Sequence, residues 1–108
     1  MGYTNYWHQY NDFTDEQWKT IKEEYEDYVK PLAGQDIKDS SDTNDICFDG
    51  MCETFLLSKS AKTIKDYPEQ DVSFSFCKTR MAKYDIYVWY LLTFINRLVP
   101  EFSISRDR

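Results

Sequence analysis

The sequence predicts an α+β fold, with a mainly antiparallel sheet of about five strands and two helices in the order β-α-β-β-β-α-β. Three patterns indicate this fold: two segments with apolar residues at helical spacing, one segment with strict alternation, and an Asp-Gly pair between strand-like runs. Of the 108 residues, 42% are apolar and 18% aromatic, which is typical of a packed globule. The length predicts a single domain, residues 1–108.

The chain opens with a predicted strand at residues 2–8, which is rich in aromatic and β-branched side chains. A helix is expected to follow, with Thr14 as its N-cap residue and Gln17 completing a capping box. Lys30 and Pro31 are expected to end this helix. Its apolar stripe is predicted to consist of Trp18, Ile21, Tyr25, Tyr28 and Val29.

The middle of the chain predicts a loop and then a hairpin. Residues 33–45 are small, polar and acidic, which is typical of a loop. Asp49 and Gly50 separate two strand-like runs, 46–48 and 51–57, and favour a two-residue type I′ turn.

The predicted hairpin would place Cys47 opposite Cys52, within reach of a disulfide. No secretory signal is recognised, so we expect both thiols to be reduced. Cys77 and His8 lie on other elements and lack the close pairing typical of zinc ligands, so no metal site is predicted.

The second half of the chain predicts a strand, a helix and a final strand. Val72, Phe74 and Phe76 alternate with small or polar residues, so their side chains are expected in the core, with Lys78 reachable from solvent. A helix is expected from residue 81 to 99, closed by a proline, and a short strand at 102–105. The helical stripe is predicted to consist of Tyr84, Tyr87, Val88, Leu91, Leu92, Ile95 and Leu98.

The charge is distributed unevenly along the chain. Residues 1–57 carry 13 acids and 4 bases, whereas residues 58–108 carry 6 acids and 9 bases, for a net charge of -6 overall. This balance disfavours direct binding of nucleic acid and favours a partner protein with a basic surface. Alternatively, the acids only keep a small domain soluble. The candidate partner-binding residues are Asp15, Glu16, Glu23, Glu24, Glu26 and Asp27.

No established catalytic motif is found. The sequence lacks a P-loop, a nucleotide-binding glycine pattern, a nucleophile elbow and HExxH, and it has a single histidine, His8. We therefore expect a non-catalytic protein without a cofactor. No apolar run approaches the length of a membrane span, so we expect no membrane association and a cytoplasmic location.

Several segments resemble a family of small uncharacterised phage and bacterial proteins. The matching segments are residues 2–7 (GYTNYW, where the family has GYTHYW), 48–50 (FDG), 52–55 (CETF), 76–79 (FCKT) and 84–85 (YD) before an apolar helix. Lys83 stands where the family usually has proline, which affects the start of that helix. The resemblance implies a phage or prophage setting and a shared fold.

The matching residues also suggest a ligand site as an alternative. The candidate ligand-binding residues are Tyr3, Tyr6, Trp7, Glu53, Lys78, Thr79, Tyr84 and Asp85, with Thr4 beside them. Aromatic rings with a lysine, acids and hydroxyls could hold a nucleotide-like ligand by stacking and charge-assisted hydrogen bonds. Equally, the aromatic rings could fill the core while Lys78 pairs with Glu53 or Asp85.

Two functional hypotheses follow. In the first, the protein is a small acidic phage accessory factor that binds and inhibits a host defence or regulatory protein, as an anti-CRISPR-like blocker or a DNA mimic. In the second, it sequesters a nucleotide-like ligand. The sequence leaves open whether the protein forms a homodimer.

Overall fold

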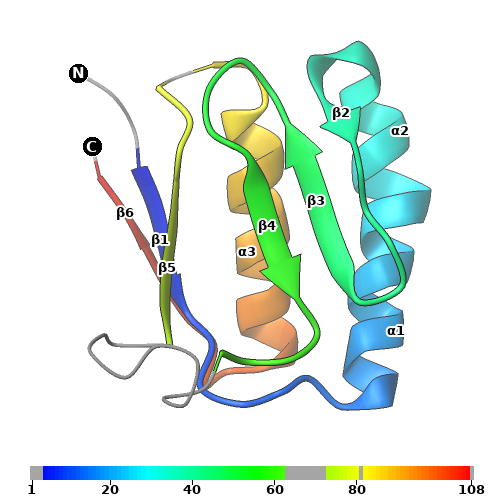
Figure 1. Ribbon diagram of the computed structural model, residues 1–108, viewed down its shortest axis with the longest axis vertical. Coiled ribbons are helices and arrows are strands. Elements are labelled where there is room, and N and C mark those ends of the chain that lie inside the picture. The colour runs from blue at the N-terminus through cyan, green and yellow to red at the C-terminus, as the bar shows by residue number, and fades with distance from the viewer. Residues whose placement is uncertain (1–3, 63–72, 81, 108) are drawn as a thin grey trace.

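The computed structural model describes residues 4–62, 73–80 and 82–107, and it has the α+β fold that the sequence predicts (Figure 1). Among these residues six strands form, rather than about five. Their bounds are Thr4–His8 (β1), Lys38–Asp39 (β2), Asp45–Asp49 (β3), Phe55–Ser58 (β4), Phe74–Lys78 (β5) and Ser103–Arg106 (β6).

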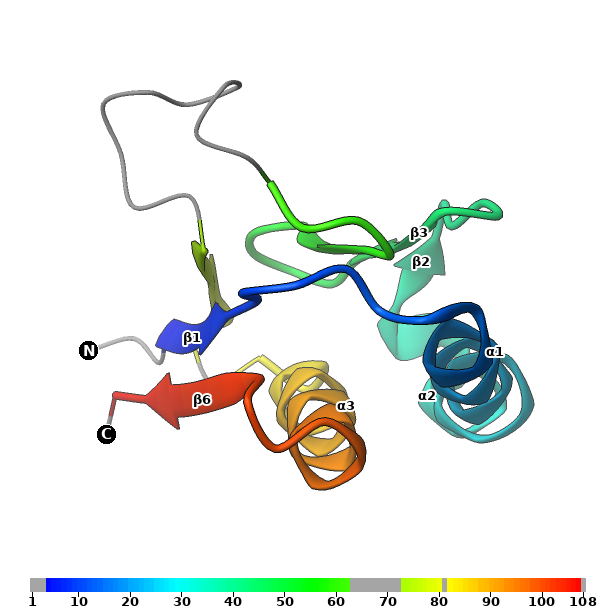
Figure 2. The ribbon, with the colours of Figure 1, turned by 90° about the horizontal axis from the view of Figure 1, so that it is seen from below.

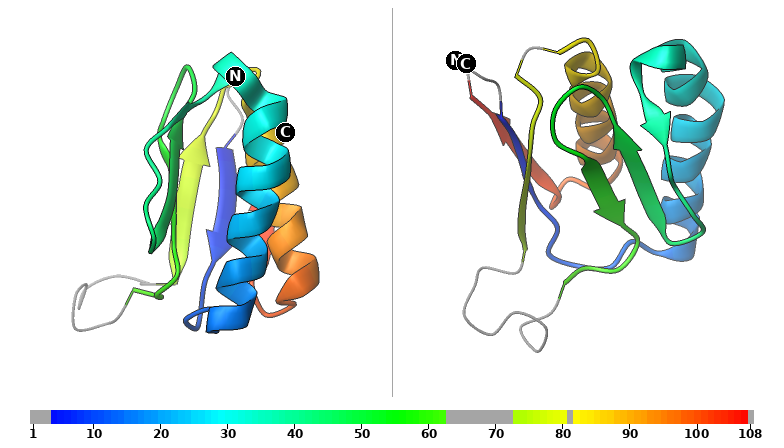
Figure 3. Two further views of the ribbon diagram at one scale, coloured as in Figure 1. Left: turned by 90° about the vertical axis from the view of Figure 1, so that its right-hand side faces the viewer. Right: turned by 45° about the horizontal axis from the view of Figure 1, so that its top comes forward.

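The strands form two antiparallel sheets, with the orders β5-β1-β6 and β2-β3-β4. Figure 2 shows the two sheets meeting at an angle, with the helices on their concave side. Figure 3 shows the same arrangement as a layer of strands beside a layer of helices. The predicted single sheet is therefore divided between β4 and β5.

The first helical segment begins as predicted. The Gln17 backbone N–H donates to Thr14 Oγ1 at 3.1 Å, and the Thr14 N–H donates to Gln17 Oε1 at 2.9 Å, which completes the capping box. The segment consists of α1 (Asp15–Glu24), a π-helical turn η1 (Tyr25–Val29) and α2 (Lys30–Ala33), followed by a 3-10 turn η2 (Gly34–Asp36).

The prediction that Lys30 and Pro31 end this helix is wrong, because the helix continues to Ala33. In the π turn, the Lys30 N–H bonds to the Tyr25 carbonyl, five residues back. This wider turn lets the chain pass Pro31, which has no N–H to donate. The helix ends at Gly34, whose φ of 53° is readily adopted by glycine.

The π turn also changes the predicted apolar stripe. Trp18, Ile21, Tyr25 and Val29 are buried, whereas Tyr28 is 49% exposed and stacks obliquely on Tyr90 of the second long helix. The prediction for Tyr28 is therefore wrong.

The predicted hairpin forms, but not with a two-residue turn. Phe48 lies opposite Phe55 and Cys47 lies opposite Leu56, so a longer loop joins β3 to β4. Cys47 and Cys52 are not cross-strand neighbours, and both are free thiols. The loop is held wide by tertiary contacts, because Gly50 packs against the Tyr84 ring.

Residues 33–45 contain more structure than the predicted loop. The strand β2 pairs with β3 and places Lys38 opposite Asp49. Asp39, at the end of β2, accepts hydrogen bonds from Tyr25 and Ser41, each at 2.6 Å. These contacts fasten β2 to the first helical segment, and no pattern in the sequence predicts them.

The alternation in β5 has the opposite phase from the prediction. Cys77 is fully buried, whereas Phe74 is 36% and Phe76 49% exposed. Ser75 lies opposite the buried Trp7, so a small side chain faces the core beside a large indole. Val72, which the prediction also placed in the core, lies outside the described residues.

The second long helix, α3, spans Asp85–Leu98, with Tyr84 as its N-cap residue, and it ends before Pro100 as predicted. The predicted start at residue 81 is wrong, because turns with the bonds Ala82 N–H to Thr79 O and Asp85 N–H to Ala82 O precede the helix. Val88, Leu91, Leu92 and Ile95 are buried, but Tyr87 is only partly buried and Leu98 is 36% exposed. The core between sheets and helices consists chiefly of Trp7, Phe13, Trp18, Ile21, Tyr25, Ile46, Phe48, Phe55, Leu57, Tyr84, Val88, Leu91, Leu92, Ile95 and Phe102.

Candidate functional site

The six acids predicted to bind a partner lie along the first helical segment, and three of them have partners within the chain. Asp15 pairs with Lys59, Glu26 pairs with Lys30, and Glu24 accepts a hydrogen bond from the Tyr90 hydroxyl. The hydrogen bond from Lys59 lowers the pKa of Asp15. Asp15 and Glu26 are therefore partly neutralised by lysines, whereas Glu24 is hydrogen-bonded but keeps its charge.

The other three acids are exposed on one side of the helix. Glu16, Glu23 and Asp27 are spaced by seven and then four residues, so they project from neighbouring positions on the same face. Within the part of the chain that the structure describes, their side chains make no ion pair or hydrogen bond. We call these three residues the acidic helix face.

The residues predicted to bind a ligand do not converge on one cavity. Tyr6 and Lys78 lie on the outer face of the β5-β1-β6 sheet, and Trp7 lies in the core. Thr79 and Asp85 are buried among other polar groups, whereas Glu53 and Tyr84 join the loop before β4 to the end of β5. Tyr3 lies outside the described residues.

Asp85 is the centre of a buried polar cluster. Its carboxylate accepts hydrogen bonds from Asn5 Nδ2 at 3.0 Å and from the Thr79 hydroxyl, and it pairs with the guanidinium of Arg106. That guanidinium lies 4.7 Å from the centre of the Trp89 ring. Burial raises the pKa of Asp85, but the three hydrogen bonds outweigh burial and lower it.

This cluster joins four elements of the fold: β1, β6, the start of α3 and the turn after β5. The sequence-based alternative of a buried polar network therefore describes Asp85 well, although the partner is Arg106 rather than Lys78. Because Asp85 is only 8% exposed and its oxygens are already bonded, it has little capacity left for a ligand.

Glu53, Lys78 and Tyr84 form a second polar junction. The Glu53 N–H donates to the Lys78 carbonyl at 3.2 Å, and the Lys78 N–H donates to Glu53 Oε1 at 2.8 Å. The Tyr84 hydroxyl donates to the Glu53 carbonyl at 2.7 Å. Burial raises the pKa of Tyr84, so this hydroxyl keeps its proton. The junction ties the two sheets together at one end of the β4–β5 boundary.

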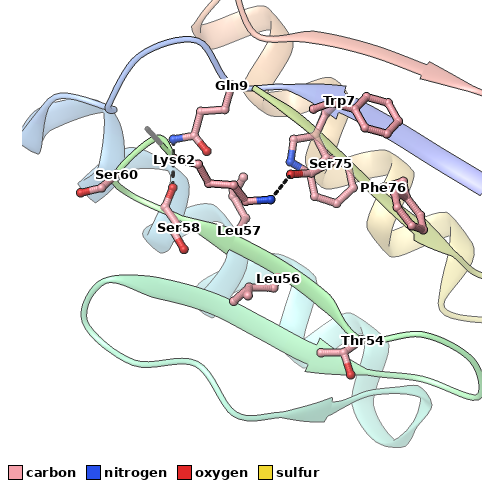
Figure 4. Close-up of a pocket in the computed structure, with 11 residues that line it drawn as sticks. Trp7, Gln9, Thr54, Leu56, Leu57, Ser58, Ser60, Lys62, Ser75 and Phe76 are labelled. Carbon is pink, nitrogen blue, oxygen red and sulfur yellow. Dashed lines mark hydrogen bonds between the residues drawn. The ribbon is translucent and has the colours of Figure 1, made fainter. Parts of the chain in front are cut away.

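Beyond this junction the two sheets separate and leave an open groove of about 460 Å³ (Figure 4). Its floor includes Trp7 and Leu57, and its walls include Leu56 of β4 and Phe76 of β5. At the far end the Gln9 side chain donates to the Ser58 carbonyl at 3.0 Å. The volume lies within the range typical of small-molecule and cofactor sites.

An exposed aromatic cluster adjoins the groove on the outer face of the β5-β1-β6 sheet. Tyr6 stacks on Phe74 with ring centres 5.7 Å apart, and Phe74 also contacts His8 and Phe76. The alternation of aromatic and small residues in β5 was a signal for this cluster, but alternation alone does not say which side of a strand is buried.

Neither a metal site nor a membrane span is found in the described part of the chain. No group of three or more His, Cys, Asp or Glu residues described here is arranged to hold a metal ion. Among the described residues, no helix is long and apolar enough to cross a membrane.

Comparison with protein-family models, with curated proteins and with solved structures finds no match for this chain.

Proposed function

We propose that this chain is a non-catalytic phage or prophage accessory protein that binds and inhibits a host defence or regulatory protein through the acidic helix face. The observation that carries the proposal is the position of Glu16, Glu23 and Asp27, which are exposed on one side of the helix without side-chain partners in the described part of the chain. Carboxylates placed in this way attract a basic surface and speed its association.

The phage setting rests on the sequence resemblance, and the inhibitory role rests on the charge. A partner that normally binds nucleic acid has a basic channel, and an acidic helix could occupy such a channel. The nucleotide-binding alternative stays a prediction with less support, because Thr79 and Asp85 are buried and bonded to other residues of the chain.

The proposal is tested by capturing partners from bacterial lysate on the immobilised protein, identifying them by mass spectrometry and measuring their association rates at low and high salt. Glu23→Lys reverses one charge of the acidic helix face. Glu101→Lys, a matched control, reverses an exposed acid in the turn between α3 and β6. We expect Glu23→Lys to slow association and flatten its salt dependence, because exposed charges are screened over about 8 to 10 Å at physiological salt.

Equal effects of the two reversals would show that only net charge matters. Unchanged association of the Glu23→Lys variant would exclude the acidic helix face as the binding surface. Mass spectrometry of small molecules that co-purify with the protein tests the alternative. A nucleotide retained by wild-type protein would favour that hypothesis instead.

A further inference from the structure

We propose that the groove between β4 and β5 binds an extended, uncharged segment of a partner protein, which adds a strand between the two sheets. The groove is lined on both sides by strand edges, and the groove-facing backbone groups of Leu56, Phe74 and Phe76 are unpaired in the described part of the chain. Edges of this kind are templates for strand addition. This surface is separate from the acidic helix face, and the inference does not depend on the proposed function.

The register of β5 shows which of its backbone groups face the groove. In an antiparallel pair, the backbone groups of every second residue bond to the partner strand. Because the Gln9 N–H donates to the Ser73 carbonyl, the backbone groups of Ser75 and Cys77 also bond to β1. The backbone N–H and C=O groups of Phe74 and Phe76 therefore point away from β1 and into the groove.

The register of β4 gives the opposite edge. The Lys59 N–H donates to the Asn44 carbonyl. By the same alternation, the backbone groups of Leu57 and Phe55, two and four residues earlier, bond to β3. The backbone groups of Leu56 and Ser58 then face the groove. The Ser58 carbonyl already accepts a hydrogen bond from the Gln9 side chain, whereas the N–H and C=O groups of Leu56 bond to none of the residues that the structure describes.

The two edges cannot close on each other by extending the junction at Glu53 and Lys78. After Glu53 and Lys78, the next pair in an antiparallel ladder would be Phe55 with Phe76. The backbone groups of Phe55, however, are directed to Phe48 on β3. The backbone N–H of Glu53 bonds to β5, whereas the backbone groups of Phe55, two residues later, bond to β3. This change of direction accounts for the gap between the two sheets.

The lining of the groove indicates the chemistry of the bound segment. Trp7 and Leu57 form an apolar floor, and Leu56 and Phe76, 53% and 49% exposed, offer apolar walls. Lys62 is the one charged residue among the lining side chains that the structure describes, and none of these described side chains is a carboxylate. A chain with a net charge of -6 thus has a groove that favours a neutral, β-branched segment.

The experiment selects binders from a phage-displayed library of random octapeptides on the immobilised full-length protein. The enriched octapeptide is synthesised and its dissociation constant measured. Amide hydrogen exchange by NMR then follows the N–H groups of Leu56 and Phe76. We expect enriched peptides without proline and with alternating β-branched residues, fast exchange of both amides in the free protein, and slowed exchange in the complex.

Two proline variants test the backbone contacts. Leu56→Pro and Phe76→Pro remove groove-facing N–H groups that neither sheet uses, and Leu56→Val and Phe76→Val retain them as matched controls. We expect each proline variant to bind the octapeptide roughly two- to tenfold more weakly than its valine control, the factor that one lost hydrogen bond represents.

The hydrogen-exchange result does not depend on the folding of any variant. Protection of Leu56 and Phe76 in the free protein at all concentrations would mean that the chain fills its own groove, and protection only at high concentration would identify a second copy. Either outcome would overturn the proposal, as would octapeptides that bind the proline and valine variants equally.

Discussion

Gly50 lies so close to Tyr84 that a Cβ atom added to the glycine would come within 2.1 Å of Tyr84 Cγ. The glycine is therefore required by the aromatic ring that packs against it, rather than by a two-residue turn. The same ring is held by the hydrogen bond from its hydroxyl to the Glu53 carbonyl. One glycine thus links the β3–β4 loop to the start of α3.

Replacing Gly50 with alanine should destabilise the fold by about 1 to 3 kcal/mol, because the methyl group forces the ring or the loop to move. The double variant Gly50→Ala with Tyr84→Ala should lose less than the sum of the two single changes, since the overlap is then absent. Gly34→Ala, which has no atom within 4 Å of the new Cβ but a φ of +53°, serves as the control for backbone strain. Urea unfolding measures all four, and additive losses would contradict the close contact.

The buried cluster around Asp85 should be far more sensitive than the exposed Lys78. Asp85→Asn leaves the Arg106 guanidinium without its carboxylate partner, which we expect to cost about 3 to 5 kcal/mol. Lys78→Met should change the free energy of unfolding by less than about 1 kcal/mol, the scale of an exposed charge. Denaturant unfolding of both variants checks this. A larger loss of unfolding free energy from Lys78→Met than from Asp85→Asn would show that Lys78, rather than Asp85, is the more important member of a buried polar network.

Asp39 should make stability depend on pH in the acid range. Burial raises the pKa of Asp39, but hydrogen bonds from Ser41, Tyr25 and Lys30 outweigh it and lower the pKa to about 2. Because this pKa is lower in the folded state, its stabilisation is present above about pH 4 and is lost as the pH falls towards 2.

The Asp39 carboxylate should contribute about 1 to 2 kcal/mol to the free energy of unfolding at neutral pH. Asp39→Asn should lose this contribution at neutral pH and approach wild-type stability near pH 2. Thermal unfolding across this range gives the difference between the two proteins. A difference that does not shrink with acidification would show that the carboxylate charge is not the cause.

The three cysteines should differ in reactivity. Burial raises the pKa of Cys77 to about 12, so its thiol should react with an alkylating agent only after unfolding. Cys47 and Cys52 are partly exposed free thiols and should be alkylated in the native protein. Intact-mass measurement over time counts the labels. Loss of both native labels, restored by reduction, would instead indicate a disulfide between Cys47 and Cys52.

Local patterns in the sequence predicted the α+β fold, the first capping box and the end of α3 before Pro100, because each depends on neighbours in the chain. The Thr14 and Gln17 side chains bond to backbone groups three residues away, so their types alone define the helix start. Charge and spacing likewise predicted six acids along this helix, but contacts with residues distant in sequence, Lys59 and Tyr90, are part of what sets the acidic helix face apart from the other acids.

The phase of β5, the width of the β3–β4 loop and the position of the groove could be decided only by tertiary structure. Phe74 and Phe76 alternate with Ser75 and Cys77 in either phase of the strand. The large Trp7 indole on β1 occupies the buried side, so the small Ser75 lies opposite it and the two phenylalanines face outward. The Asp49–Gly50 pair favours a tight turn, but packing of Gly50 against Tyr84 holds the loop wide. These contacts join residues distant in sequence, so their physical cause lies in packing and register rather than in local propensity.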